Sequence, residues 1–217
     1  RGARVPVGVI ELASPEVAGL PPEQYEIIGT KESFRLAQRP GSYVLIKYVR
    51  PIVKRVATQL ISCPAAPVGV IEGSRADVSF VAGLLLDKMA YHLPFHRVHQ
   101  RLLDAGFKVS RPWLTQLGQQ ASSLLEPIYD AQLASIRASR AIAMDETPIK
   151  AGQNGPGKMK QGYFWPVYGE LAEVCFPFFD NRRADSVVKT LGLTPAQSAV
   201  LLSDGYSAYE NYARKTG

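Results

Sequence analysis

Two short stretches of the sequence carry an aspartate within or just after an apolar run. The first, AIAMDETPIK at residues 141–150, places Asp145 and Glu146 in the middle of what its apolar pattern predicts to be a buried strand. The second, AVLLSDGYSAY at residues 199–209, runs through apolar residues to Asp204. Because an ionised carboxylate taken out of water is costly unless a positive group compensates it, both stretches indicate carboxylates that bind a cation.

The chemistry that such carboxylates support is metal-dependent phosphoryl transfer. Hard cations such as Mg²⁺ and Mn²⁺ take oxygen ligands, and paired metal ions need carboxylates that bridge or flank them. Alternate residues of a strand face opposite sides, so Glu146 is expected to point away from Asp145, which leaves Asp145 and Asp204 as the expected ligands. Taken alone, Asp145 could simply end a strand or pair with Lys150. Asp204 with Gly205 could form an ordinary turn.

The segments around these aspartates predict a mixed sheet in residues 140–217. Three strands, an amphipathic helix and a fourth strand are expected at residues 141–150, 163–170, 173–180, 182–193 and 199–206. Short turns allow the first three strands to form a meander, and the helix returns the chain so that the fourth strand pairs with the first in parallel. This pairing brings Asp145 and Asp204 to one edge of the sheet. A β-β-β-α-β unit of this kind is the first, incomplete part of a ribonuclease-H-like fold, so we expect an α/β class, or α+β for the chain as a whole.

Residues 1–72 predict a small β-rich module that ends in a linker. Runs of β-branched and aromatic residues, broken by Gly and Pro, indicate short strands at residues 7–10, 25–28, 33–36 and 43–49. Pro40 and Gly41 are expected to form a turn between two of them. The proline-punctuated segment 61–72 is typical of a linker.

Residues 73–139 predict a helical region. Ser74 and Asp77 resemble a capping box at the start of a helix that extends to about residue 90. Pro94 opens a second helix, which ends near Gly106. The region therefore begins with two helices joined by a short connection.

A third helix follows and completes a helical hairpin. Ser110 is expected to cap it, Pro112 falls in its first turn, and Pro127 marks a kink or break before residues 128–136. Helix, turn and helix form the pattern of a helix-turn-helix, whose second helix presents its N-terminal residues to the DNA major groove. An ordinary hairpin packed on its neighbours has the same pattern. The pattern alone leaves both interpretations open.

Eight basic residues are candidates for contacts with DNA phosphates. Four lie on the helical hairpin, two in the Gly/Asn/Lys-rich turn at residues 152–162, and two at the start of the crossover helix. They are Arg97, Arg101, Lys108, Arg111, Lys158, Lys160, Arg182 and Arg183. The excess of 25 Lys and Arg over 19 Asp and Glu favours a polyanionic partner such as DNA, with a solvated basic surface as the alternative.

Composition disfavours several other classes of protein. At 217 residues with 46% hydrophobic content, the chain is long enough for a packed core. No apolar run approaches the ~18 residues of a membrane span, and no secretory leader is expected. Cys63 and Cys175 lack CxxC spacing, so we expect reduced thiols.

Two further groups of residues are expected to have no role in chemistry. The histidines are interrupted by a proline and no carboxylate or thiol completes a zinc set with them; they are His92, His96 and His99. Aromatic residues of the predicted meander are assigned to the core of the sheet in preference to base stacking; they are Tyr163, Phe164, Trp165, Phe176, Phe178 and Phe179.

Several motifs taken together resemble the transposases of the insertion sequence 66 family. They are KMAYHLPFHRVHQRLLDAGFKVSRPWL, AMDETPIK, KMKQGYFWPVYGE, FFDNRRAD and LLSDGYSAYENY, and the resemblance is most specific over residues 84–212. It implies a DDE transposase, a polynucleotidyl transferase that cuts DNA at transposon ends and joins the freed 3′-hydroxyl to target DNA with Mg²⁺. Asp145 in DET and Asp204 in SDGY match its first two catalytic carboxylates. The resemblance also implies a bacterial, cytoplasmic and nucleoid-associated protein that acts as a homo-oligomer.

The sequence departs from the family pattern in two places. Family members carry paired cysteines as a zinc-binding element in the N-terminal module, whereas Cys63 stands alone, which makes zinc binding doubtful. The family's third carboxylate, a glutamate on a later helix, is expected beyond Gly217, because Glu210 follows Asp204 too closely to replace it. We therefore expect a chain that binds DNA but is catalytically incomplete. The alternative is a non-catalytic DNA-binding module from a truncated or decayed transposase gene.

Overall fold

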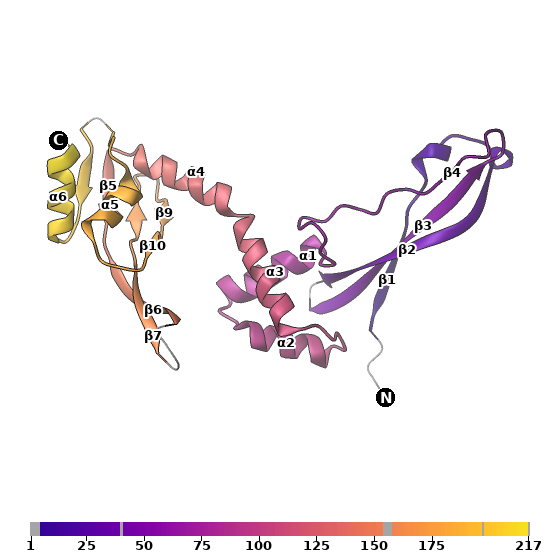
Figure 1. The fold of residues 1–217 in the computed structure, drawn as a ribbon, viewed down its shortest axis with the longest axis horizontal. Helices are drawn as coiled ribbons and strands as arrows, with labels where there is room; N and C mark the ends of the chain where they lie inside the picture. The colour runs from indigo at the N-terminus through magenta and orange to yellow at the C-terminus, as the bar shows by residue number, and fades with distance from the viewer. Residues whose placement is uncertain (1–4, 40, 154–157, 197, 217) are drawn as a thin grey trace. The chain divides into compact units, whose positions relative to one another are not determined.

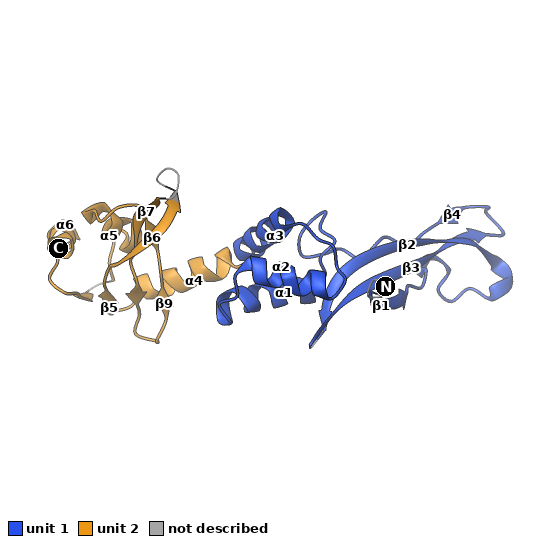
Figure 2. Cartoon of the chain, turned by 90° about the horizontal axis from the view of Figure 1, so that it is seen from below, with its two compact units in different colours: residues 1–124 blue, residues 125–217 orange. Residues whose placement is uncertain are grey.

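The computed structural model describes residues 5–39, 41–153, 158–196 and 198–216 (Figure 1). It divides into two compact units, unit 1 at residues 1–124 and unit 2 at residues 125–217 (Figure 2). Pro40 of the first predicted turn and residues 154–157 of the Gly/Asn/Lys-rich turn lie outside the described residues. Within the described ranges, each helix is too short or too polar to cross a lipid bilayer.

Unit 1 contains a sheet built on one long antiparallel hairpin. Its strands are β1 (Val7–Glu11), β2 (Tyr25–Arg39), β3 (Ser42–Arg55) and β4 (Ile61–Ser62), with short 3₁₀ helices η1 (Pro15–Val17) and η2 (Pro22–Gln24) between β1 and β2. β2 pairs with β3 over nearly its full length, while β1 joins β3 in parallel and β4 joins it antiparallel. The strands expected at residues 25–28 and 33–36 are therefore parts of one strand. The register shifts at a β-bulge between Ile27 and Gly29, and the pairing then continues without a break through the polar residues 30–32.

Helices complete the described part of unit 1. They are α1 (Val78–Leu85), the π-helical turn η3 (Leu86–Ala90), α2 (Phe95–Asp104) and α3 (Arg111–Ser123). The N-cap of α1 is Asp77, whose carboxylate accepts the Ser79 N–H at 3.0 Å, while Ser74 lies outside the helix and does not take part in a capping box. Ser110 caps α3 as predicted, by accepting the Trp113 N–H at 3.3 Å.

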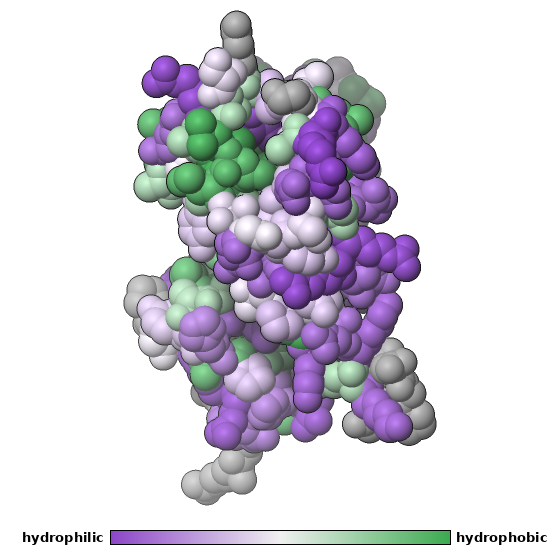
Figure 3. Space-filling model, turned by 90° about the vertical axis from the view of Figure 1, so that its left-hand side faces the viewer, coloured by the Kyte–Doolittle hydropathy of each residue, from purple (hydrophilic) through white to green (hydrophobic). Residues whose placement is uncertain are grey.

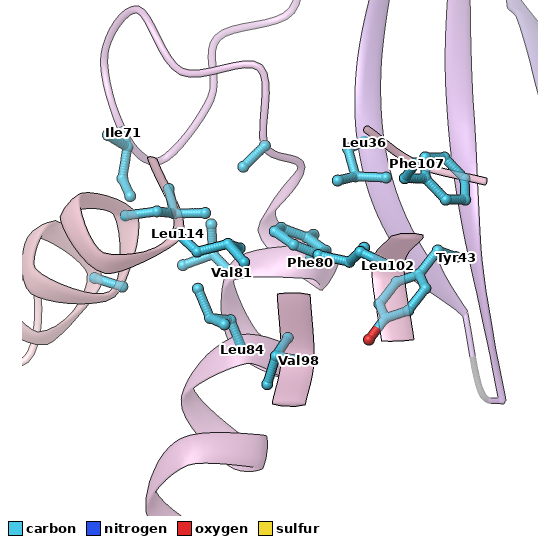
Figure 4. Close-up of a cluster of buried hydrophobic side chains, with 13 residues drawn as sticks. Leu36, Tyr43, Ile71, Phe80, Val81, Leu84, Val98, Leu102, Phe107 and Leu114 are labelled. Atoms are coloured by element: carbon cyan, nitrogen blue, oxygen red, sulfur yellow. The ribbon is translucent and has the colours of Figure 1, made fainter. Parts of the chain in front are cut away.

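The apolar faces of these helices form the core of unit 1 with the adjoining ends of β2 and β3 (Figure 4). Leu102 of α2 and Leu114 of α3 are fully buried, and Phe80 of α1 stacks on Trp113 with ring centroids 5.9 Å apart. Gly106 turns the chain between α2 and α3 with φ of 88°, in the left-handed region that favours glycine. The hairpin thus packs on α1 through its buried face, and any contact with DNA would use its exposed face.

Unit 2 contains the predicted mixed sheet in two parts. Its elements are α4 (Glu126–Arg137), β5 (Ala141–Met144), β6 (Thr147–Gln153), β7 (Met159–Phe164), β8 (Val167–Tyr168), β9 (Val174–Cys175), β10 (Phe178–Phe179), α5 (Ala184–Leu191), β11 (Val200–Leu202) and α6 (Ser207–Thr216). One sheet has the order β11-β5-β8-β9 and the other the order β10-β7-β6. β5 and β11 are parallel neighbours, which confirms the pairing predicted for the first and fourth strands.

Each strand of the meander is interrupted, which corrects the prediction of three continuous strands. The interruptions lie side by side, because the Asp145 N–H donates to the Pro166 carbonyl at 3.2 Å and the Trp165 N–H donates to the Pro177 carbonyl at 2.8 Å. Pro166 and Pro177 lack the N–H that a continuous ladder would require. At these aligned interruptions each of the three segments leaves one sheet and enters the other. Asp145 and Glu146 form the first interruption, between β5 and β6.

The core of unit 2 combines side chains from α4, α5, α6 and the β5 sheet. Trp165 is fully buried within it, as predicted, with its ring centroid 6.1 Å from that of Tyr209. Phe176 and Phe178 are 53% and 46% exposed, so their assignment to the core was wrong. The physical reason is that Phe178 lies on the edge strand β10 and Phe176 directly follows the edge strand β9.

Candidate functional site

The parallel pair β5 and β11 brings two acidic loops to the same edge of the sheet. Leu202, the last residue of β11, pairs with Ala143, the residue before the end of β5. Parallel strands have their carboxyl ends at the same edge, so the chain leaves both strands in the same direction. Asp145 follows β5 directly, and Asp204 lies two residues beyond β11.

Three carboxylates meet at this edge. Asp145, Glu146 and Asp204 each offer an oxygen atom, and these three atoms all lie within 4.8 Å of one another. The expectation that Glu146 points away from Asp145 is therefore wrong. Strand alternation does not apply here, because β5 ends at Met144 and both acidic residues lie in the interruption before β6.

Both aspartates are exposed, and the main chain orients each of them. The Glu146 N–H donates to Asp145 Oδ1 at 2.7 Å, and the Tyr206 N–H donates to Asp204 Oδ1 at 3.0 Å. Among the described residues, no lysine or arginine forms an ion pair with either aspartate, so the alternative pairing with Lys150 is not found. Neither aspartate has a cationic side-chain partner among the described residues, so a metal ion could take that place.

Glu146 differs from its two acidic neighbours because its side chain is buried, with 2% exposed. Arg182 donates to its Oε1 through Nε at 2.8 Å and through Nη2 as well. The Tyr209 hydroxyl donates to its Oε2 at 2.7 Å. Burial, followed by the hydrogen bond to Glu146, raises the pKa of the Tyr209 hydroxyl, so it keeps the proton that it donates.

Arg182 also reaches the loop that carries Asp204. Its guanidinium lies over the Tyr206 ring, 4.2 Å from the centroid, and the Tyr206 hydroxyl donates to the Arg182 carbonyl at 3.1 Å. The hydrogen bond to Glu146 raises the pKa of the Arg182 side chain, which therefore stays charged. We refer to Glu146, Arg182, Tyr206 and Tyr209 as the anchor cluster.

The donor set at this edge fits a hard divalent cation. All three groups offer carboxylate oxygen, which Mg²⁺ and Mn²⁺ prefer, and two of them are exposed to an incoming ion. Asp145, Glu146 and Asp204 could therefore hold a metal ion together. No other such group of His, Cys, Asp or Glu side chains occurs in the described ranges.

The four basic candidates of unit 1 lie on or between α2 and α3. Arg97, Lys108 and Arg111 are exposed. Arg101 is partly engaged inside the unit, because its Nη1 donates to Asp87 Oδ2 at 2.9 Å and its guanidinium lies 5.8 Å from the centre of the Tyr43 ring. Arg101 is exposed as well, but its charge already has a partner inside the unit.

The four basic candidates of unit 2 have different surroundings. Lys158 and Arg183 are exposed, and Lys160 pairs with Asp180 at 3.0 Å. Arg182 belongs to the anchor cluster and does not extend freely into solvent. The four residues thus do not form one uniform basic surface.

Sequence patterns predict only part of the anchor cluster. Tyr206 lies two residues after Asp204, directly before α6, and Tyr209 lies in the first turn of that helix, so their spacing of i and i+3 brings the two rings together. That signal was available in the stretch DGYSAY. The partner of Tyr209, Glu146, was not, because its burial depends on where β5 stops.

Comparison with known proteins is consistent with this geometry. A family model described as "Transposase IS66 family" matches residues 73–217. Two uncharacterized proteins of Sinorhizobium fredii, y4qI and y4jD, are each 29% identical to the chain over 95% and 70% of its length, and the chain spans 40% and 31% of theirs. Because the family model covers well over half of the chain, this protein belongs to the IS66 family of transposases.

Proposed function

We propose that the chain is part of a transposase that carries out metal-dependent DNA cleavage and strand transfer. The observation that carries this proposal is the meeting of Asp145 and Asp204 at the ends of two parallel strands, in a chain of this family. Residues 140–217 would form the first part of a ribonuclease-H-like catalytic domain. The strand order β11-β5-β8-β9, with its crossover helix α5, supports that assignment.

In this proposal Asp145 and Asp204 hold the catalytic metal. Membership of the family implies a divalent ion, and the all-oxygen donor set favours Mg²⁺ or Mn²⁺. When bound, the ion would polarise the scissile phosphate and activate the attacking hydroxyl. Hydrogen bonds from the main chain at Glu146 and Tyr206 would hold the carboxylates of the two aspartates in place for the ion.

The third catalytic carboxylate is not among these residues in our proposal. Glu210 lies on α6 and pairs with Arg214 at 3.5 Å, one helical turn along the same helix. We therefore expect residues 1–217 to bind DNA and to cleave it poorly. Vigorous Mg²⁺-dependent nicking of plasmid DNA by the purified chain, abolished in Asp145→Asn, would contradict the incompleteness while supporting the metal site.

We assign DNA binding to the exposed face of α2, the turn and α3. Arg111 is the first residue of α3, and Arg97 and Lys108 lie on the neighbouring helix and turn, where all three are exposed. The N-terminus of a helix adds favourable electrostatics for phosphate. The partners of the whole protein would be transposon ends and target DNA, with a second copy of the chain in the active assembly and a place at the bacterial nucleoid.

Charge reversal tests this assignment. Arg97→Glu and Arg111→Glu should each weaken binding to duplex DNA and reduce the slope of log K against log salt by about one, since each phosphate contact releases about one counterion. Fluorescence anisotropy at several salt concentrations measures both effects. The matched control is Lys189→Glu, the same charge change at an exposed position of α5. Equal slopes in the wild type and all three variants would show that the helical hairpin does not contact DNA phosphates.

A second candidate is a non-catalytic DNA-binding module. The observation that favours it is that, among the described residues, only Glu146 adds a carboxylate near Asp145 and Asp204, and the anchor cluster already engages Glu146. In that case the chain would occupy DNA without using a metal ion. DNA binding with no measurable affinity for Mn²⁺ would support this candidate over the first.

A further inference from the structure

Both carboxylate oxygens of Glu146 already have strong partners. Oε1 accepts from Arg182 Nε at 2.8 Å and from Arg182 Nη2, and Oε2 accepts from the Tyr209 hydroxyl at 2.7 Å. Charge-assisted hydrogen bonds of this kind are about twice as strong as neutral ones. A metal ion at this edge would have to compete with Arg182 or Tyr209 for Glu146. Asp145 and Asp204 present no such competition from the side chains described.

A continuous chain of contacts runs from one aspartate to the other through the anchor cluster. It starts with the Glu146 N–H on Asp145 Oδ1 and passes through the Glu146 carboxylate to Arg182. From there the Arg182 guanidinium lies on the Tyr206 ring at 4.2 Å, and the Tyr206 N–H donates to Asp204 Oδ1. The first and last links lie within the two aspartate loops, and the two Arg182 contacts join these loops to each other, so the cluster connects the two aspartates.

We propose that Glu146 and Arg182 are positioning residues, which preset Asp145 and Asp204 for a metal ion and do not bind the ion or the DNA themselves. The inference deepens the proposed function and rests on it. It assigns Glu146 a role other than a third ligand. It also gives Arg182 a role other than the phosphate contact that its charge suggested.

If Arg182 acted only through its charge, replacing it would change metal affinity in the direction opposite to that expected for a positioning residue. A cationic side chain this close to Asp204 repels an incoming metal ion, and the Coulomb interaction between Arg182 and Asp204 is favourable in the metal-free protein. Removing the charge would therefore tighten metal binding if Arg182 had no positioning role. If Arg182 positions the aspartates, removing it weakens metal binding.

The Tyr209→Phe change also separates the two roles of Glu146, because each role predicts a different direction of change in metal affinity. The Tyr209→Phe change removes the donor to Glu146 Oε2 and retains the ring that packs on Trp165. A Glu146 that acts as a ligand would gain a free oxygen, and metal affinity would rise or stay constant. A Glu146 that acts as a positioning residue would be held less firmly, and metal affinity would fall.

The experiment measures Mn²⁺ affinity of the full 217-residue chain by electron paramagnetic resonance titration. Arg182→Met should bind Mn²⁺ at least tenfold more weakly than the wild type, in line with the 10–100-fold losses seen when groups that orient metal ligands are removed. Tyr209→Phe should bind it a few-fold more weakly. Lys189→Met, which removes one positive charge from an exposed site on α5, should bind it as the wild type does.

Wild-type or tighter affinity in both Arg182→Met and Tyr209→Phe would overturn the inference. Circular dichroism of each metal-free variant identifies any that is unfolded at the temperature of the titration. If Arg182→Met is unfolded, the milder Tyr209→Phe decides the question by the sign of its change. Failure of the proposed function gives a different result, in which the wild type binds no Mn²⁺ or Asp145→Asn binds it equally well.

Discussion

The ends of β5 and β11 both deliver an aspartate, but they are built differently. β5 is an inner strand of its sheet, paired on both sides, and the residue after Asp145 is the buried Glu146. β11 is an edge strand, paired with β5 alone, and its Val200 and Leu202 are 55% and 58% exposed. Figure 3, which looks onto the side at the left of Figure 1, shows a largely hydrophilic surface interrupted by an apolar area.

The two aspartates accept similar main-chain hydrogen bonds, but the strands that carry them are held in place by different numbers of contacts. Asp145 follows a strand held by pairing, by core packing of Met144 and by the anchored Glu146. Asp204 follows a strand held mainly by β5, and its loop is tied to unit 2 through the stacking of Tyr206 on Arg182. We therefore expect substitutions at the end of β5 to lower the free energy of unfolding more than those at the end of β11. Substitution of either aspartate should weaken metal binding to the same extent.

The largest expected effect is on stability, from Glu146→Ala. This change leaves Arg182 without its acidic partner and the buried Tyr209 hydroxyl without its acceptor. Leaving a buried hydroxyl without a partner costs about 1–3 kcal/mol, and we expect a loss of this size in the free energy of unfolding, with little added by the exposed Arg182. Asp204→Ala should change the free energy of unfolding by about 0.5 kcal/mol or less.

Tryptophan fluorescence can isolate this effect in unit 2. The chain has two tryptophans, and in a Trp113→Phe background the buried Trp165, next to Tyr209, reports on unit 2 alone. Urea titrations of Glu146→Ala and Asp204→Ala in this background give the two free energies. Equal losses would show that the β5 end is no better supported than the β11 end.

The second effect concerns metal binding, where the two ends should be alike. At Mn²⁺ concentrations tenfold above its dissociation constant, the wild type should gain about 1.4 kcal/mol in stability. Asp145→Asn and Asp204→Asn should each lose most of this gain, because each removes one anionic ligand with little change in shape. Thermal unfolding with Mn²⁺ and after addition of EDTA measures this gain in stability. A loss in only one variant would mean that the ion binds at one strand end.

The third effect compares the strands themselves. Ile142 of β5 is 5% exposed, so Ile142→Val should cost about 1 kcal/mol through the lost methylene and the small cavity. Leu202→Ala removes more of a side chain, yet it should cost about 0.5 kcal/mol or less, since Leu202 is already 58% exposed. The same urea titration compares them, and a larger cost for Leu202→Ala would show that β11 is buried in solution.

The sequence was sufficient to predict the pairing of β5 with β11 and the meeting of Asp145 with Asp204. These followed from apolar runs, short turns and the room for one crossover helix, all of which are local patterns. The interruptions in the meander were not predicted, although Pro166 and Pro177 were visible in the sequence. Their effect is collective, because the three breaks are aligned by hydrogen bonds between strands, and a single strand carries no sign of that alignment.

The role of Glu146 depended on those interruptions. Strand alternation holds only within a strand, and Glu146 lies beyond the end of β5, so alternation predicts the wrong side for its carboxylate. Arg182 was assigned to phosphate from its charge, since its partner is 36 residues away in the sequence and is identified only by the tertiary structure. Charge predicted that Arg182 would bind an anion, and the structure provides one within the protein.

The smallest expected effect concerns the exposed pair Lys160 and Asp180, on the β6–β7–β10 sheet. It contrasts with the pair of Arg182 and Glu146, in which the carboxylate is buried. The hydrogen bond from Lys160 lowers the pKa of the Asp180 carboxyl, with a further contribution from Asn181. A carboxyl whose pKa is lower in the folded state adds stability above its unfolded pKa and loses it as the pH falls through the folded value.

The Lys160→Met variant should therefore be slightly less stable than the wild type at neutral pH, and the difference should vanish as Asp180 becomes protonated in acid. Raising the salt concentration at neutral pH should also reduce it, because both side chains are exposed and screened. Thermal unfolding across pH and salt tests both trends. A difference that persists in acid would come from packing of the Lys160 stem, and the contrast between the two pairs would then rest on contacts other than charge.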